Sequence, residues 1–224
     1  MDQAGLMELI GRINTEEEHF TRSDQTVSWK ALREAETLAD PALFPLLREV
    51  ITANEGRAKA KREVRRAAYF IYGRLMEKAF SPAEASFFLE RLTMETEKYV
   101  LSALLDRVGD WGRKGQLLPE EMDFSPVLAL TRDDRRSVRH DALRALSACP
   151  GEESRAACSF YLRQEDERSY QYEIYYANIA LQAIGTGAEI PLLERFLKSR
   201  RPDLKLTAQY AIQYIRERET AALG

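Results

Sequence analysis

The most regular feature of the chain is a spacing of apolar residues that returns several times along its length. In five segments, an apolar residue is followed four, seven and eight positions later by small or apolar residues. These offsets place the side chains on one stripe of an α-helix, which is typical of a helix buried along one face. The segments begin at Val64, Val100, Val138, Tyr176 and Leu204, and Arg107 is the one clear departure from the pattern.

The stripe recurs with the period of a helical repeat protein. Its second position is occupied by Ala68, Leu104, Ala142, Ala180 and Ala208, which are separated by 36, 38, 38 and 28 residues. A fixed period of this length indicates stacked structural repeats. The series extends backward to Val27, Ala31 and Ala35. Each striped helix is preceded by another apolar helical segment, at 6–13, 43–51, 83–92, 126–130, 156–162 and 190–197.

We therefore predict an all-α fold, a right-handed superhelix of about six antiparallel helix pairs that forms one domain over residues 1–224. Pro41, Pro82, Pro126 and Pro202 mark helix starts, because proline is tolerated in the first turn. A recurring alanine indicates close helix contact, where a larger side chain would clash. The approximate repeats are 1–39, 40–78, 81–109, 119–148, 151–185 and 188–218.

The repeats resemble a known family. The segment with Asp134, Val138, Arg139, Ala142 and Leu146 is similar to the second helix of a HEAT repeat, and segments 61–72 and 203–212 are weaker copies. The resemblance covers nearly the whole chain. It implies helix pairs stacked so that the second helices line a concave surface, which often holds a partner. The leading hypothesis is a non-enzymatic binding or scaffold protein that presents this surface to a protein partner.

Composition excludes several classes of function. The chain is 45% hydrophobic and 31% charged, which is typical of a folded protein, and its net charge of -3 gives no global attraction to nucleic acid. No apolar run is long enough for a membrane span, and no leader is evident, so we expect a cytoplasmic protein without membrane contact. Cys149 and Cys158 lack a paired spacing, and His19 and His140 lack ligand neighbours. We expect no metal, no cofactor and no catalytic residues.

Two local runs of basic residues are candidates for partner contact. Arg62, Arg65 and Arg66 share one helix face, where they would meet phosphates or an acidic protein surface. The alternative is a solvated face on which Arg65 pairs with an acidic residue of an adjacent repeat. The second run contains Arg135 and leads to His140, which occupies the position in its repeat that Arg66 occupies in an earlier one. If equivalent positions line up, the two runs form a discontinuous basic strip.

Aromatic residues supply further candidates. Trp111 lies in the glycine-rich stretch 109–115, which predicts a long loop between repeats. It would contact a partner there, or alternatively cover the edge of the solenoid. Tyr176 belongs to a buried stripe, whereas Tyr172 and Tyr175 point elsewhere and either contact a partner or pack on the next repeat. The predicted partner-binding residues are Arg62, Arg66, Trp111, Arg135, His140, Tyr172 and Tyr175.

Two other functional classes stay open. In length and helical design, the chain resembles the alkylpurine DNA glycosylases of HEAT-like fold, which use tryptophans and an aspartate beside arginines. Only Asp106, Asp110, Trp111 and Arg113 offer a comparable set, and nucleic acid would otherwise bind through the local basic runs. The third class is chromophore handling with a partner protein, because phycobilin lyase-like proteins carry related short helical repeats.

Overall fold

The computed structural model describes residues 1–19 and 21–222, and within them the chain forms twelve α-helices arranged as six consecutive pairs. The first helices of the pairs are α1 (Gln3–Ile13), α3 (Leu43–Ala53), α5 (Pro82–Met94), α7 (Ser125–Leu130), α9 (Glu152–Leu162) and α11 (Ile190–Glu194). The second helices are α2 (Val27–Ala35), α4 (Lys59–Met76), α6 (Lys98–Arg113), α8 (Arg136–Ala145), α10 (Gln171–Ile184) and α12 (Pro202–Ala222). Four short 3₁₀ helices are interspersed: η1 (Ser23–Gln25), η2 (Leu146–Ala148), η3 (Gly187–Glu189) and η4 (Arg195–Lys198).

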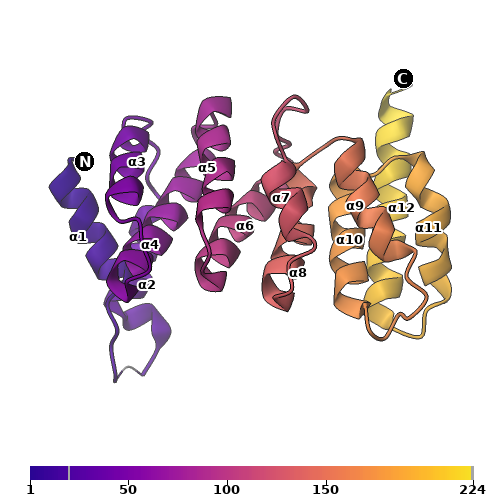
Figure 1. Ribbon diagram of the computed structural model, residues 1–224, viewed down its shortest axis with the longest axis horizontal. Helices are drawn as coiled ribbons and strands as arrows, with labels where there is room; N and C mark the ends of the chain where they lie inside the picture. The colour runs from indigo at the N-terminus through magenta and orange to yellow at the C-terminus, as the bar shows by residue number, and fades with distance from the viewer. Residues whose placement is uncertain (20, 223–224) are drawn as a thin grey trace.

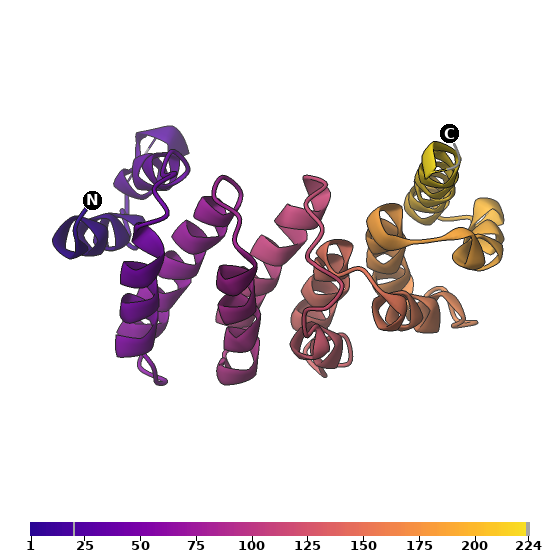
Figure 2. The same ribbon diagram turned by 90° about the horizontal axis from the view of Figure 1, so that it is seen from above.

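The helix pairs stand side by side in chain order, from α1 at one end to α11 and α12 at the other (Figure 1). Seen from above, the helices form two nested rows that bend together, and the second helices make up the inner row (Figure 2). The predicted all-α solenoid of six helix pairs is confirmed. We call the exposed side chains of the second helices the inner face.

Packing between successive second helices forms much of the core. Helix α4 packs on α6, α6 on α8, α8 on α10, and α10 on α12. The small residues expected at these contacts are fully buried, as are the apolar residues around them. Pro82, Pro126 and Pro202 lie in the first turns of α5, α7 and α12, whereas Pro41 lies just before α3. The marker residues at 0% exposure are Ala31, Ala68, Leu104, Ala142, Ala180 and Ala208.

The glycine-rich stretch was predicted to be a loop, and this prediction is wrong. Helix α6 continues through Gly109 and Gly112 to Arg113. Both glycines lie where α6 meets the following helix pair: Gly109 faces Arg144, and a Cβ on Gly112 would overlap the backbone of Ser147. The glycines therefore allow close helix packing, and the connecting loop starts only after the helix.

Replacing Ala142 by Leu tests this packing. Ala142 is fully buried in α8, which packs between α6 and α10, so the larger side chain should lower the free energy of unfolding by about 1–3 kcal/mol. Chemical denaturation of the two proteins measures the difference. The control is Ala156→Leu on exposed α9 surface, with an expected change within about 0.5 kcal/mol. Equal losses in the two variants would contradict the assignment of Ala142 to the helix contact.

Candidate partner-binding surface

Two arginines of the basic runs, Arg65 and Arg139, make contacts between helix pairs instead of projecting from the inner face. Arg65 holds the carboxylate of Glu95 with two hydrogen bonds, of 2.6 Å from Nε and 2.7 Å from Nη2, and its side chain is 5% exposed. Its Nη1 also donates to the carbonyls of Asn54 and Gly56, in the loop before α4. Arg65 therefore ties its own helix pair to the acidic residue that follows α5, and the alternative that it pairs with an adjacent repeat is confirmed.

Arg139 repeats this arrangement two pairs later. Its Nη2 lies 2.7 Å from Oε1 of Glu173, at the start of α10, and its Nη1 donates to the carbonyl of Asp133, before α8. Burial is the largest influence on the pKa of Glu173 and raises it, but the hydrogen bond from Arg139, a backbone hydrogen bond and the charges of Arg139 and His140 together lower the pKa. Each arginine thus bonds to the loop before its own helix and to a buried carboxylate of the next pair. We call these two contacts the arginine clamps.

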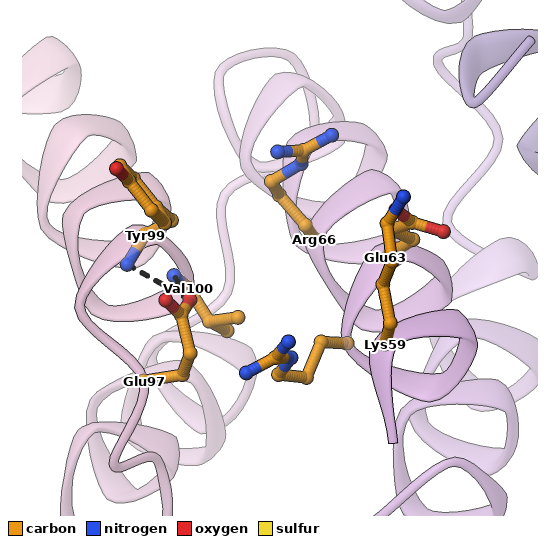
Figure 3. Close-up of a pocket in the computed structure, with 7 residues that line it drawn as sticks. Lys59, Glu63, Arg66, Glu97, Tyr99 and Val100 are labelled. Atoms are coloured by element: carbon orange, nitrogen blue, oxygen red, sulfur yellow. Dashed lines mark hydrogen bonds and ion pairs between the residues drawn. The ribbon is translucent and has the colours of Figure 1, made fainter. Parts of the chain in front are cut away.

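The first candidate site is a cavity between α4 and α6, which we call the basic cavity (Figure 3). It has a volume of about 260 Å³, and Arg62 and Arg66 line it. Neither guanidinium has a carboxylate at ion-pair distance within the described part of the chain. Figure 3 shows Arg66 and Tyr99 on facing helices across the cavity, and Tyr99 is 62% exposed. Lys59, Glu63, Glu97 and Val100 complete the lining.

Glu97 makes no ion pair with these arginines among the described residues, and it is the N-cap of α6. Its carboxylate accepts hydrogen bonds from the backbone amides of Tyr99 at 2.9 Å and Val100 at 3.1 Å. Lys59 lies 3.4 Å from Glu63, so those two charges offset each other. The three cations and two carboxylates of the lining leave a surplus of one positive charge. Arg62 and Arg66, which make no ion pair with the described residues, are the groups that can bind a carboxylate or a phosphate.

His140 does not continue a basic strip. It is half-buried, with its ring centroid 5.6 Å from Tyr172 and 5.3 Å from Tyr176. Burial lowers its pKa, and the opposing attraction of Glu173 does not restore it, so the imidazole is neutral at pH 7. Helix α6 also lies between α4 and α8, and it places Asp106 against Arg144. The two basic runs are thus separated by a neutralised region.

Arg135 lies in the turn before α8 and is held there. Its Nε and Nη2 contact the carboxylate of Asp133 at 2.8 and 2.7 Å, and its Nη1 donates to the carbonyl of Thr96 at 2.6 Å. The same contact lowers the pKa of Asp133. Arg135 therefore connects two successive helix pairs, and its charge is already neutralised.

The prediction that Trp111 lies in a surface loop and contacts a partner is wrong. Trp111 is in the last turn of α6 and is 0% exposed; its Nε1 donates to the carbonyl of Gly73 at 3.2 Å. Its ring packs on Phe88, with centroids 5.2 Å apart. The neighbouring Asp110 is also buried. The resemblance to DNA glycosylases implies an exposed tryptophan beside an aspartate. Trp111 and Asp110 do not form such a site, because both are buried.

Arg107, the departure from the apolar pattern, belongs to a charged cluster beside Trp111. Its guanidinium lies 2.8 Å from Asp110, and its aliphatic stem fills the space that a Cβ on Gly73 would occupy. Burial lowers the pKa of Arg107 to about 10, and the nearby charge of Arg74 adds to the effect. The arginine is tolerated in the stripe because Gly73 leaves room for its stem and Asp110 receives its charge.

The second candidate site is a group of tyrosines at the C-terminal end of the inner face. Tyr172 on α10 and Tyr210 and Tyr214 on α12 are 44% to 47% exposed, beside Leu206 at 48%. The rings of Tyr210 and Tyr214 stack with centroids 6.3 Å apart. Tyr175 is half-buried, and so is Tyr176, which was predicted to be buried. We call these six residues the tyrosine surface.

Sequence reasoning missed Tyr210 and Tyr214. The signal was present, because the two tyrosines lie four positions apart and outside the stripe of Leu204, Ala208 and Ala211. Such a pair shares a helix face away from the core. Beside them, a pocket of about 420 Å³ lies among α6, η2, α10 and α12.

Metal and membrane sites have no counterpart among the described residues. No group of three or more His, Cys, Asp or Glu side chains in residues 1–19 and 21–222 is placed to hold a metal ion. No helix in these ranges combines the length and apolar character of a membrane span. Burial raises the pKa of the thiols of Cys149 and Cys158, which makes both unreactive.

Comparison with known proteins supports the fold. No family model and no curated protein matches the chain. Among solved structures, the designed armadillo repeat protein YIII(Dq)4CqI is similar, with a TM-score of 0.52 at 16% sequence identity. The chain is an α-solenoid. The match covers 94% of this solenoid and 99% of the designed protein, so the likeness extends over nearly the whole chain and concerns the fold alone.

Replacing Glu95 by Gln tests the first arginine clamp. The variant leaves Arg65 buried without a counter-charge, so the free energy of unfolding should fall by about 3–5 kcal/mol. The matched control is Asp24→Asn, which removes the partner of the exposed Arg22 and should cost less than about 1 kcal/mol. Denaturant unfolding of both variants measures the difference, and similar small losses would show that the clamp does not stabilise the fold.

The environment of His140 predicts its titration. Its pKa should lie below the ordinary value of 6.5, and Tyr172→Ala should raise it by admitting water. Because the pKa is lower in the folded state, the stability that His140 contributes is present above about pH 6.5 and is lost as the pH falls. Proton NMR of the imidazole measures both values. A wild-type midpoint above 6.5 would contradict the assigned burial.

Proposed function

We propose that this solenoid is a non-enzymatic binding or scaffold protein whose concave inner face holds a protein partner. The observation that carries the proposal is the tyrosine surface, where Tyr172, Tyr210 and Tyr214 remain nearly half exposed on adjacent second helices. Tyrosine and arginine are enriched at protein interfaces, because each offers a large contact area and a polar end. Arg62 and Arg66 of the basic cavity supply the second residue type on the same face.

The arrangement of charge favours a protein over nucleic acid. Duplex DNA carries one negative charge for every ~1.7 Å of its axis, so its binding favours a continuous basic track. The inner face interrupts that track at α6 and α8, where Asp106 and Asp141 lie beside Arg144. A protein segment with a few acidic residues can bind through basic residues that are separated from one another, so the interruption does not prevent its binding. Nucleic-acid binding is therefore the alternative that the test must exclude.

Affinity capture from a lysate of the source cells tests the proposal. Wild-type protein and a Tyr172→Ser/Tyr210→Ser double variant serve as bait, and captured proteins are quantified by mass spectrometry. Both tyrosines are exposed, so the variant should fold. The amount of each specific partner that it captures should fall by about tenfold or more, as for interface hot spots.

The control bait is Met94→Ser, which changes an exposed apolar residue at the end of α5, in the outer row. It should retain every partner of the wild type. Equal capture by all three baits would contradict binding at the inner face. Salt-sensitive binding of a duplex oligonucleotide, abolished by Arg62→Glu/Arg66→Glu, would instead support the nucleic-acid alternative.

A further inference from the structure

The pocket beside the tyrosine surface has an apolar lining that the described residues leave open. We call it the C-terminal pocket; its apolar lining consists of Leu117, Ile179, Ala183 and Tyr214. Leu117 comes from the loop after α6 and is 43% exposed. The volume of about 420 Å³ lies near the lower end of the ~300–1,000 Å³ typical of ligand pockets. It fits a group the size of one or two side chains.

A cation with no carboxylate lines one side of this pocket. Arg218 donates to the backbone carbonyls of Gln182 and Gly185, and it has no ion pair within the described ranges. Burial lowers the pKa of Arg218, and the charge of Glu219 opposes this only in part. The carboxylate of Glu219 accepts a hydrogen bond from the backbone amide of Gly187 at 2.7 Å and makes no ion pair with Arg218 within the described ranges. No carboxylate of the described residues lines the pocket, so Arg218 presents a cation to an acidic group there.

A second arginine, Arg113, lines the same pocket. Its ion-pair partner among the described residues, Asp110, also contacts two other arginines. The side chain of Arg113 is 52% exposed and contacts Asp110. Asp110 also lies 2.8 Å from Arg107 and 3.9 Å from Arg74, although Arg74 pairs more closely with Glu77, at 2.8 Å. The pocket thus combines an apolar lining with surplus positive charge. An occupant that matches it has an apolar group next to a negative one.

We infer that the C-terminal pocket binds an acidic peptide segment of the partner, in which an apolar side chain stands beside an Asp or Glu. The apolar side chain packs between Leu117, Ile179 and Tyr214, and the carboxylate contacts Arg113 and Arg218. The rest of the segment lies on the tyrosine surface, where Tyr210 and Tyr214 are stacked. This assignment rests on the proposed function, because it names the chemistry of the partner at one end of the same face.

Selection from a displayed library of random short peptides tests the assignment. Peptides that bind the wild-type protein should share an apolar residue next to Asp or Glu. The best of them, synthesised with a fluorescent label, is then titrated and followed by anisotropy. Replacing its acidic residue by the matching amide should weaken binding by about tenfold, the usual effect of losing a charge-assisted hydrogen bond.

Variants of the pocket complete the experiment. Arg113→Gln should weaken binding of the labelled peptide by about tenfold. It should leave the thermal midpoint unchanged, because Asp110 still contacts Arg107 and Arg74. Leu117→Ser should also weaken it, by removal of apolar contact. The matched control is Arg163→Gln, at an exposed position at the end of α9, with no expected effect.

Four outcomes would overturn the assignment. Peptides that bind without an acidic preference, or that bind Arg113→Gln as well as wild type, would refute the pocket chemistry. If the Tyr172→Ser/Tyr210→Ser variant still bound the selected peptides more weakly than the wild type, the proposed function would stand. Failure to select any peptide would also refute the assignment, and the capture experiment would then decide the proposed function separately. Tight binding of a labelled single-stranded oligonucleotide that is lost in Arg113→Gln would replace the peptide by nucleic acid.

Discussion

The curvature of this solenoid depends on how each helix pair is held against the next, and the arginine clamps are the most specific contacts of this kind. In a stacked repeat protein each unit touches only its neighbours, so the angle at each interface determines where every later helix lies. Arg65 on Glu95 and Arg139 on Glu173 fix that angle with charge-assisted hydrogen bonds, and each arginine also bonds to the loop before its own helix. Such buried pairs add little net stability compared with apolar packing, but losing one partner is costly.

The clamps also explain why two of the sequence predictions succeeded together. Two of the segments on which the resemblance to HEAT repeats rests, 61–72 and 134–146, each contain a valine followed by an arginine. In the structure the valine lies on the stripe and the arginine reaches the next pair. The periodic stripe was predictable because burial along one helix face leaves a local pattern in sequence. Pairing of Arg65 with an acidic residue was also predictable. The identity of that residue was not, because Glu95 lies thirty positions away and nothing local marks it.

The candidate surface was harder to predict, since exposure depends on neighbours that are distant in sequence. Gly109 and Gly112 follow the usual rule for a loop, yet they permit close approach between α6 and the next pair, and Trp111 is buried as a result. His140 is a second position where distant neighbours decide exposure. Its position in the repeat predicts a basic residue on the face, but the tyrosines of α10 surround it and its pKa falls.

The clamps leave a particular distribution of charge on the inner face. Because Arg65 and Arg139 bind carboxylates between repeats, and Arg144 is neutralised by Asp106 and Asp141, much of the positive charge of the second helices is already paired. Both candidate pockets are lined by arginines: Arg62 and Arg66 line the basic cavity, and Arg113 and Arg218 line the C-terminal pocket. A partner that engages both must span the surface between the two pockets. Its recognition then depends on the separation of its acidic groups as well as on their number, and the rigid stacking of the helix pairs keeps that separation constant.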